Sequence, residues 1–133
     1  MNVVDVEGIG PLYAAKLESA GVKTTDDLLQ RGATQKGREE LEAASGIGRV
    51  LILKWVNRVD LYRVNGIGSE YSDLLEVAGV DTVPELSYRN AANLTQTMAE
   101  ANAARNLVRR LPTLEVVADW IEQAKKLPRV VQY

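Results

Sequence analysis

Apolar residues recur every three or four positions through most of the chain, a spacing that predicts amphipathic helices. No stretch alternates between apolar and polar residues as a half-buried strand would, so the pattern predicts an all-α fold. In the first half, the spacing predicts helices near 11–19, 25–29, 35–44 and 49–63. In the second half, it predicts helices over 69–77, directly after Thr82, over 91–101, near 103–110 and over 114–126.

Capping residues support most of these helix boundaries. Gly21 and Gly79 follow two of the helices, at a position where a left-handed backbone favours glycine. Pro128 ends the last helix, because proline cannot continue the helical hydrogen bonding. Side chains that can accept hydrogen bonds from the first helical amides precede five segments: Thr24, Thr34, Thr82, Asn90 and Thr113.

The helix predicted over 49–63 is unusually apolar. One face holds five apolar or aromatic residues, and three leucines lie outside that face: Ile52, Trp55, Val56, Val59 and Tyr62, then Leu51, Leu53 and Leu61. A helix that is apolar nearly all round is buried on several sides. We therefore expect a central strut that joins both halves into a single integrated domain, residues 1–133.

The tripeptide Gly-Ile-Gly occurs three times, and each copy lies between two predicted helices. We call these turns the first, second and third hairpins: Gly8-Ile9-Gly10, Gly46-Ile47-Gly48 and Gly66-Ile67-Gly68. Paired glycines let the backbone take positive φ and turn sharply. They also leave amide groups uncovered at the start of the next helix, where the helix dipole favours an anion.

An internal repeat relates the two halves of the chain. At an offset of 58 residues, the first hairpin aligns with the third, and Tyr13 aligns with Tyr71. Further along, the offset widens to 65, where Trp55 aligns with Trp120. The repeat predicts two halves, 1–63 and 64–133. Where the first half has the second hairpin, the other half has Leu111-Pro112-Thr113, so a fourth hairpin has lost its glycines.

The composition restricts the chemistry. The chain contains neither cysteine nor histidine, which removes the thiolate nucleophile, the commonest general base and the commonest metal ligands. Three neighbouring carboxylates, Glu39, Glu40 and Glu42, lie on a charge-rich helix and are expected to be solvated. We therefore predict no catalytic residue, no metal site, no evident small-molecule substrate and a non-enzymatic role.

No segment of the sequence indicates a membrane or a secretory route. The longest uncharged apolar run has four residues, Val50 to Leu53, far short of the roughly 18 needed to span a bilayer. The first residues lack the basic-then-apolar pattern of a signal peptide. We expect a soluble, cytoplasmic protein with no membrane partner.

Two segments resemble helix-hairpin-helix motifs: VVDVEGIGPLYAAKLESAGV at 3–22 and LYRVNGIGSEYSDLLEVAGV at 61–80. Nearly the whole chain resembles an uncharacterised bacterial family, a domain of unknown function built from such motifs, including its closing stretch at 107–127. This resemblance implies duplicated helix-hairpin-helix pairs in a compact, SAM-like helical domain. It also implies DNA binding without sequence readout, with hairpin amides on phosphates. A monovalent cation held by turn carbonyls is the only cofactor that it suggests.

Charge ranks the hairpins as phosphate sites. The second hairpin ranks highest, because basic residues follow its glycines; the predicted site is Gly46, Ile47, Gly48, Arg49, Lys54 and Arg58. The first hairpin is nearly neutral and contributes Gly8, Gly10 and Lys16. In the third hairpin, Gly66 and Gly68 are predicted to be structural, because Glu70 and Asp73 repel a phosphate.

Two functions follow from these features. The first is weak, sequence-independent binding of nucleic acid through the second and possibly the first hairpin. The second is a protein-interaction or scaffold module that has kept the fold and lost nucleic-acid binding, which a net charge of −2 and a pI near 5.2 favour. Each candidate residue also has a plainer interpretation. The glycines permit tight packing, and the basic residues form a solvated face.

Three further features have no predicted role in nucleic-acid binding. Trp55, Trp120, Tyr13 and Tyr71 are expected to lie in the core. A second basic cluster is expected to be a solvated face or a partner contact: Arg105, Arg109 and Arg110. The terminal segment, residues 127–133, is short and apolar, and is expected to dock on the body or on a partner.

Overall fold

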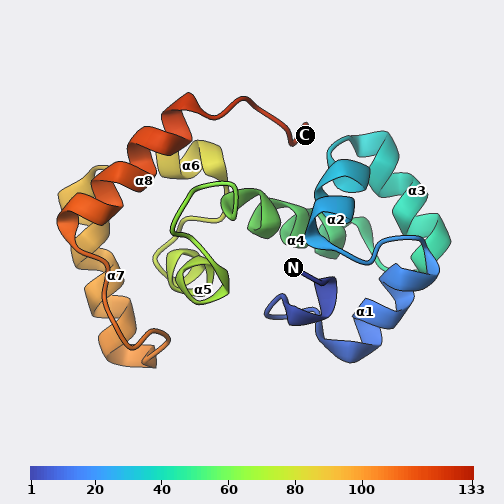
Figure 1. Cartoon of the computed structure of the whole chain (residues 1–133), viewed down its shortest axis with the longest axis horizontal. Coiled ribbons are helices and arrows are strands. Elements are labelled where there is room, and N and C mark those ends of the chain that lie inside the picture. Colours follow the sequence, from blue (N-terminus) through green and yellow to red (C-terminus); the bar gives the residue numbers. More distant parts are fainter. The chain divides into compact units, whose positions relative to one another are not determined.

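The fold is all-helical, as the sequence predicts. The computed structural model describes all 133 residues and contains eight α-helices, one short 3-10 helix and no strand (Figure 1). One isolated bridge pairs Asn2 with Thr24. None of the helices has both the length and the hydropathy needed to cross a membrane.

Backbone contacts divide the chain into two compact units. Unit 1 comprises Met1–Asp60 together with Arg129–Tyr133, and unit 2 comprises Leu61–Pro128. The boundary follows Asp60, close to the predicted division after residue 63, but the last five residues return to unit 1. The single integrated domain expected from the sequence stays a prediction.

Unit 1 contains the 3-10 helix and four α-helices: η1 (Val3–Asp5), α1 (Gly10–Ser19), α2 (Thr25–Gly32), α3 (Gln35–Ser45) and α4 (Arg49–Leu61), whose final residue belongs to unit 2. Helix α3 packs against both α1 and α2, and α1 also packs against η1. The core of unit 1 is aliphatic, with one tryptophan at its centre; its fully or nearly fully buried side chains include Leu17, Leu28, Leu41, Ile52 and Trp55.

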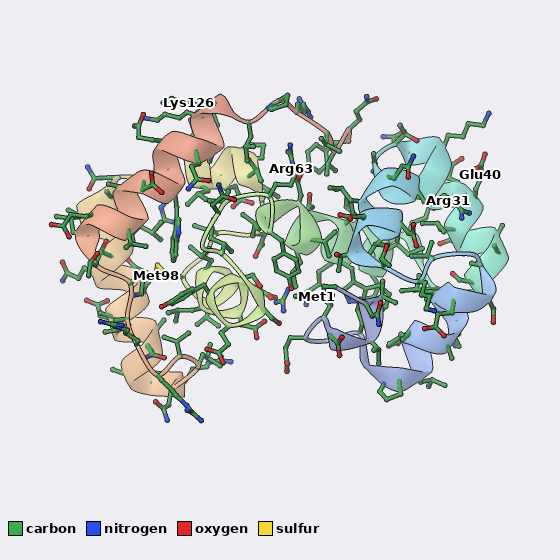
Figure 2. The ribbon with its side chains drawn as sticks, viewed as in Figure 1. Met1, Arg31, Glu40, Arg63, Met98 and Lys126 are labelled. Carbon is green, nitrogen blue, oxygen red and sulfur yellow. The ribbon has the colours of Figure 1, made fainter.

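Unit 2 contains four α-helices: α5 (Ser69–Val77), α6 (Val83–Ser87), α7 (Ala91–Arg105) and α8 (Leu114–Lys126). Helices α7 and α8 lie side by side, and α8 also packs on α6 (Figure 1). Met98 on α7, labelled in Figure 2, is fully buried in the same hydrophobic cluster as Trp120. Unit 2 therefore has a core of its own.

The predicted helix caps are confirmed. Each cap side chain accepts a hydrogen bond from the backbone N–H three residues further on, at 3.0–3.2 Å: Thr24, Thr34, Thr82, Asn90 and Thr113. At Thr24 the bond is reciprocal, because Asp27 Oδ2 accepts from the Thr24 N–H at 3.1 Å. These local bonds explain why the boundaries of the helices follow so closely from the sequence.

Positions related by the sequence repeat make equivalent contacts in the two units. Tyr13 packs on Trp55 with ring centroids 5.1 Å apart, and Tyr71 packs on Trp120 at 5.2 Å. Arg31, labelled in Figure 2, donates to the Ala20 carbonyl at 3.1 Å. Its counterpart 58 residues later donates in the same way, from Arg89 to Ala78 at 3.5 Å. Both tryptophans are buried, as predicted.

The helix predicted near 103–110 is wrong. Helix α7 continues to Arg105 and stops because Asn106 adopts a left-handed conformation, with φ of 52°. The Asn102 side chain then holds the following loop, accepting from the Val108 N–H at 2.9 Å and donating to the Val108 carbonyl at 3.1 Å. Residues 106–113 are not helical, so Arg109 does not share a helix face with Arg105.

Candidate binding surface of unit 1

The second hairpin keeps an open glycine turn. Gly46 ends α3 in the left-handed region, with φ of 75°, and its N–H donates to the Glu42 carbonyl at 2.8 Å. Ile47 is buried, whereas Gly46 and Gly48 are exposed. A Cβ added at either glycine would meet no atom within 4 Å. Ile47 therefore anchors the turn while both glycines face solvent.

A carboxylate of the chain itself occupies the start of α4. The Arg49 backbone N–H donates to Glu42 Oε2 at 2.7 Å. The Arg49 guanidinium also lies 3.4 Å from Glu42 Oε1 and 3.1 Å from Glu39 Oε1. These side chains are about half exposed, and ion pairs of this kind contribute roughly 0–1 kcal/mol. An incoming phosphate would therefore compete with Glu42 at this helix end.

The other two basic residues of the predicted phosphate site have different environments. Lys54 is exposed on α4. Arg58 is only 8% exposed, and its guanidinium donates to the Glu7 carbonyl at 3.3 Å. Glu7 directly precedes the first hairpin, so the structure places the charge of Arg58 there. The spacing of four residues between Lys54 and Arg58 does not give them a common solvent-facing role.

The first hairpin is open as well. Gly8 and Gly10 have φ of 91° and 68°, and a Cβ at either would meet no atom within 4 Å. Pro11 occupies the start of α1 and removes one amide donor from the turn. Leu12 is 71% exposed, and Lys16 Nζ lies 5.8 Å from the centroid of the Tyr13 ring. This hairpin presents apolar surface and one lysine.

The third hairpin is closed at one of its two glycines. Gly66 has φ of 99°, and a Cβ there would lie 2.9 Å from the indole nitrogen of Trp120. Gly68 is open, but exposed Glu70 lies in the first turn of α5. The close approach of Trp120 gives Gly66 a packing role, whatever else the turn does.

A groove of about 320 Å³ opens beside Arg49 in unit 1. Its apolar lining comes from Val50, which is 87% exposed, from half-buried Leu53, and from Tyr133. Its polar lining comes from four residues of α3 and α4: Gln35, Arg38, Glu39 and Arg49. The sequence carries no signal for this groove, because Tyr133 is distant in sequence from the helices that line the groove with it.

The last five residues, Arg129–Tyr133, form what we call the closing segment, and they dock on unit 1. The Gln132 N–H donates to the Ala33 carbonyl at 2.7 Å, and the Tyr133 hydroxyl donates to Asn57 Oδ1 at 2.7 Å. Arg38 donates to the Gln132 carbonyl at 2.6 Å. The sequence predicted that this apolar stretch docks either on the body of the chain or on a partner. In the structure it docks on the body of the chain.

Arg38 is a deeply buried charge beside the closing segment. It is 4% exposed and also donates to the Gly32 carbonyl, at the end of α2, at 2.8 Å. Burial lowers the pKa of its guanidinium, and an interaction with Tyr133 acts in the opposite direction. Nothing in the sequence indicated this role, since Arg38 lies within a charge-rich helix that reads as solvated.

A model of the family described as "Domain of unknown function (DUF4332)" matches residues 7–127, which is most of the chain. The chain belongs to the DUF4332 family. No curated protein and no solved structure matches the chain. The DUF4332 match includes all three Gly-Ile-Gly hairpins and the helices that line the groove, but it ends before the closing segment.

No group of three or more acidic residues in this DUF4332 chain is arranged to hold a metal ion. The second basic cluster lies in unit 2, and all three of its members are exposed: Arg105, Arg109 and Arg110. Only Arg105 is helical, so these residues do not line a helix face. In unit 1, the features that favour a binding role are the two open hairpins and the neighbouring groove.

Proposed function

We propose that this chain is a non-enzymatic protein-interaction module, in which unit 1 binds a partner protein at the groove beside the second hairpin. The observation that carries the proposal is the exposure of Val50 at a groove of about 320 Å³. Apolar side chains next to polar ones are typical of protein-binding sites, where an apolar anchor is surrounded by a polar rim. Val50 and Leu53 form the apolar part, and Arg49 and Glu39 form the rim.

The proposal includes a duplicated helix-hairpin-helix architecture. Support comes from the repeated glycine turns, from threonine caps at equivalent positions, and from the matching Tyr–Trp pairs of the two units. In this architecture the turns serve mainly to join helices closely. A fold of this kind does not by itself fix a function.

The contacts of Glu42 argue against phosphate binding as the main role. A hairpin binds a phosphate when its helix amides are free and its surroundings are positive. Here the first amide of α4 is bonded to Glu42, and the Arg49 side chain is paired with two carboxylates. The third hairpin has an acidic helix start, and the fourth turn has no glycine.

Sequence-independent nucleic-acid binding is the second candidate function, and one observation favours it. The Arg49 amide holds an oxygen of Glu42 at 2.7 Å, so this helix start can accommodate an oxyanion. A phosphate that displaced Glu42 would meet the same amide and the Arg49 guanidinium. The open first hairpin would then supply a further backbone contact, next to Lys16.

The proposal is tested with a Val50→Asp variant and a matched control. Proteins captured by the wild-type chain are identified, purified and titrated against it by calorimetry. We expect Val50→Asp to weaken binding by about tenfold or more, because it places a charge at the apolar anchor. Val77→Asp, an exposed valine of unit 2, should leave the affinity unchanged. Equal binding by Val50→Asp would show that the groove is not the site.

The second candidate is tested by fluorescence anisotropy with short single- and double-stranded DNA at about 20 and 200 mM salt. We expect no binding by the wild-type chain at either concentration. Three results together would establish the second candidate. The wild-type chain would bind at the lower salt, Glu42→Gln would strengthen this binding, and the double variant Arg49→Glu with Lys54→Glu would remove it. The second hairpin would then bind phosphate. Arg58 is left unchanged in these variants, because it is buried.

A further inference from the structure

We propose that unit 1 carries a binding seat for a short non-helical peptide, that the closing segment fills this seat within the same molecule, and that a separate peptide of the same chemistry can replace it. The inference rests on the proposed interaction function and names its partner class. The partner is a peptide with a valine followed two residues later by a tyrosine. The seat consists of Ala33, Arg38 and Asn57.

The first anchor of the seat is a pair of hydrogen bonds to the peptide backbone. The Gln132 N–H donates to the Ala33 carbonyl at 2.7 Å, and the Gln132 carbonyl accepts from Arg38 at 2.6 Å. Both backbone groups of one residue are therefore bonded to unit 1, while Gln132 itself is exposed. Bonds of this kind give affinity without requiring a particular side chain at that position.

The second anchor is formed by the side chains on either side of Gln132, those of Val131 and Tyr133. Val131 is 3% exposed, and the Tyr133 hydroxyl donates to Asn57 Oδ1 at 2.7 Å. One buried residue, one exposed residue and one anchored residue follow each other, which is how bound peptides present alternate side chains to pockets. Arg129 holds the shape of the segment through a bond to the Val131 carbonyl at 3.0 Å, and its guanidinium lies 5.4 Å from the centroid of the Tyr133 ring.

Arg38, the charged residue of the seat, is also held within unit 1 by a bond that does not involve the segment. Arg38 is 4% exposed and is fixed by its bond to the Gly32 carbonyl. When the segment leaves, the Arg38 guanidinium loses the Gln132 carbonyl as a partner, and a peptide carbonyl at the same place would restore this bond. The vacated seat therefore favours any chain that offers a carbonyl at the same place.

The seat and its occupant differ in their relation to the family. Ala33, Arg38 and Asn57 lie inside the DUF4332 match, whereas the closing segment lies beyond its end at residue 127. Tyr133 also lines the groove proposed as the partner site. Displacement of the segment would remove this wall of the groove, so a peptide that replaces the segment would lie next to Val50, which is already exposed, and Leu53.

The closing segment competes with any external peptide for the seat, and this competition lowers the affinity that the wild-type chain shows for the peptide. A tethered segment acts at an effective concentration of about the millimolar range, so it blocks weak external peptides. The test uses the full chain in three forms: wild type, Val131→Asp and Gln132→Pro. The two variants weaken the segment in different ways, since the first charges the buried side chain and the second removes the N–H that bonds Ala33. Circular dichroism verifies that each variant remains helical.

The probe is a fluorescently labelled peptide of sequence Arg-Val-Val-Gln-Tyr, titrated by anisotropy. We expect both variants to bind it about tenfold or more tightly than the wild-type chain does. A control peptide with aspartate in place of its second valine should bind at least about tenfold more weakly to the same variants. Absence of peptide binding to both variants, or equal binding of the two peptides, would overturn the proposal.

One further variant separates this inference from the proposed function. Val50→Asp combined with Gln132→Pro leaves Ala33, Arg38 and Asn57 intact, so the peptide should still bind within about twofold. If the peptide binds the seat while no partner protein depends on Val50, the inference stands and the proposed function fails. If the partner protein loses affinity for Val50→Asp and the peptide binds neither Val131→Asp nor Gln132→Pro, the proposed peptide seat is wrong and the proposed partner site at the groove is supported.

Discussion

The turn between α3 and α4 and the connection between α7 and α8 occupy corresponding places in the two units. In unit 1, residues 46–48 join the helices; in unit 2, residues 106–113 do so. Both connections begin with a left-handed residue, Gly46 with φ of 75° and Asn106 with φ of 52°. Asparagine tolerates this conformation better than most residues. The repeat has therefore kept the helix end without keeping the glycine.

The helices that follow begin differently. Helix α4 starts at once, and the carboxylate of Glu42 bonds its first amide. Helix α8 starts after a loop that is held by Asn102 and by the Tyr71 hydroxyl, which donates to the Arg110 carbonyl at 2.9 Å. The Thr113 side chain then caps α8. In both units a side chain of the chain itself bonds an amide that a phosphate would use.

The Tyr–Trp contacts in the cores of the two units are similar, and removing either tryptophan tests how much each core depends on its contact. We expect Trp55→Ala and Trp120→Ala each to lower the free energy of unfolding by about 3–5 kcal/mol, because each leaves a large cavity. Denaturant titration followed by circular dichroism measures the loss, and fluorescence of the remaining tryptophan follows the other unit. Tyr88→Ala, at an 87% exposed position, is the control. A large loss for only one tryptophan would show that the units differ in their dependence on this contact.

The glycines that begin the first and third hairpins sharpen the comparison. Gly8 and Gly66 are 58 residues apart and have φ of 91° and 99°. Alanine at either costs about 1–2 kcal/mol because of the left-handed backbone. Gly66→Ala should cost about 1–3 kcal/mol more, since its Cβ would approach the indole of Trp120 to 2.9 Å. The midpoints of thermal and urea unfolding compare the two variants directly, and equal losses would contradict the close packing at Gly66.

The cap of α2 should give the smallest effect. Bonds from the Thr24 and Lys23 amides hold the pKa of Asp27 below its ordinary value of 3.8. The stabilisation that Asp27 provides is therefore complete above that value and is lost as the pH falls through the lower pKa of the folded state. We expect Asp27→Asn to flatten the acid limb of a stability–pH curve measured by urea unfolding. An unchanged acid limb would mean that the capping bonds do not favour the carboxylate.

The sequence predicted those parts of the fold that depend on local signals. The caps at Thr24, Thr82 and Thr113 bond amides only three residues away, so their helices begin where the pattern indicates. The end of α7 at Asn106 was not predicted, because asparagine adopts the left-handed conformation far less often than glycine does. The false helix near 103–110 resulted from this omission, since nothing else in that stretch marks the end of α7.

The candidate site was less predictable, because its contacts join distant residues. Glu42 and Arg49 meet only after the second hairpin has folded back, and helical spacing along α4 does not show this pair. Arg58 is on the expected helix but lies buried against Glu7, which is 51 residues away in sequence. Arg38 bonds Gln132 across 94 residues. Each of these contacts is set by tertiary packing, for which the spacing of residue types carries no signal.

The division of unit 1 into two stretches of chain has a consequence during synthesis on the ribosome. All of unit 2 is translated between Asp60 and Arg129, which takes several seconds at roughly 5–20 residues per second. The helices of unit 1 up to Asp60 emerge before unit 2, and the residues that fill their seat emerge after it. Each newly made molecule therefore passes through a period in which Arg38 has no Gln132 carbonyl to bond, and other nascent chains have access to it.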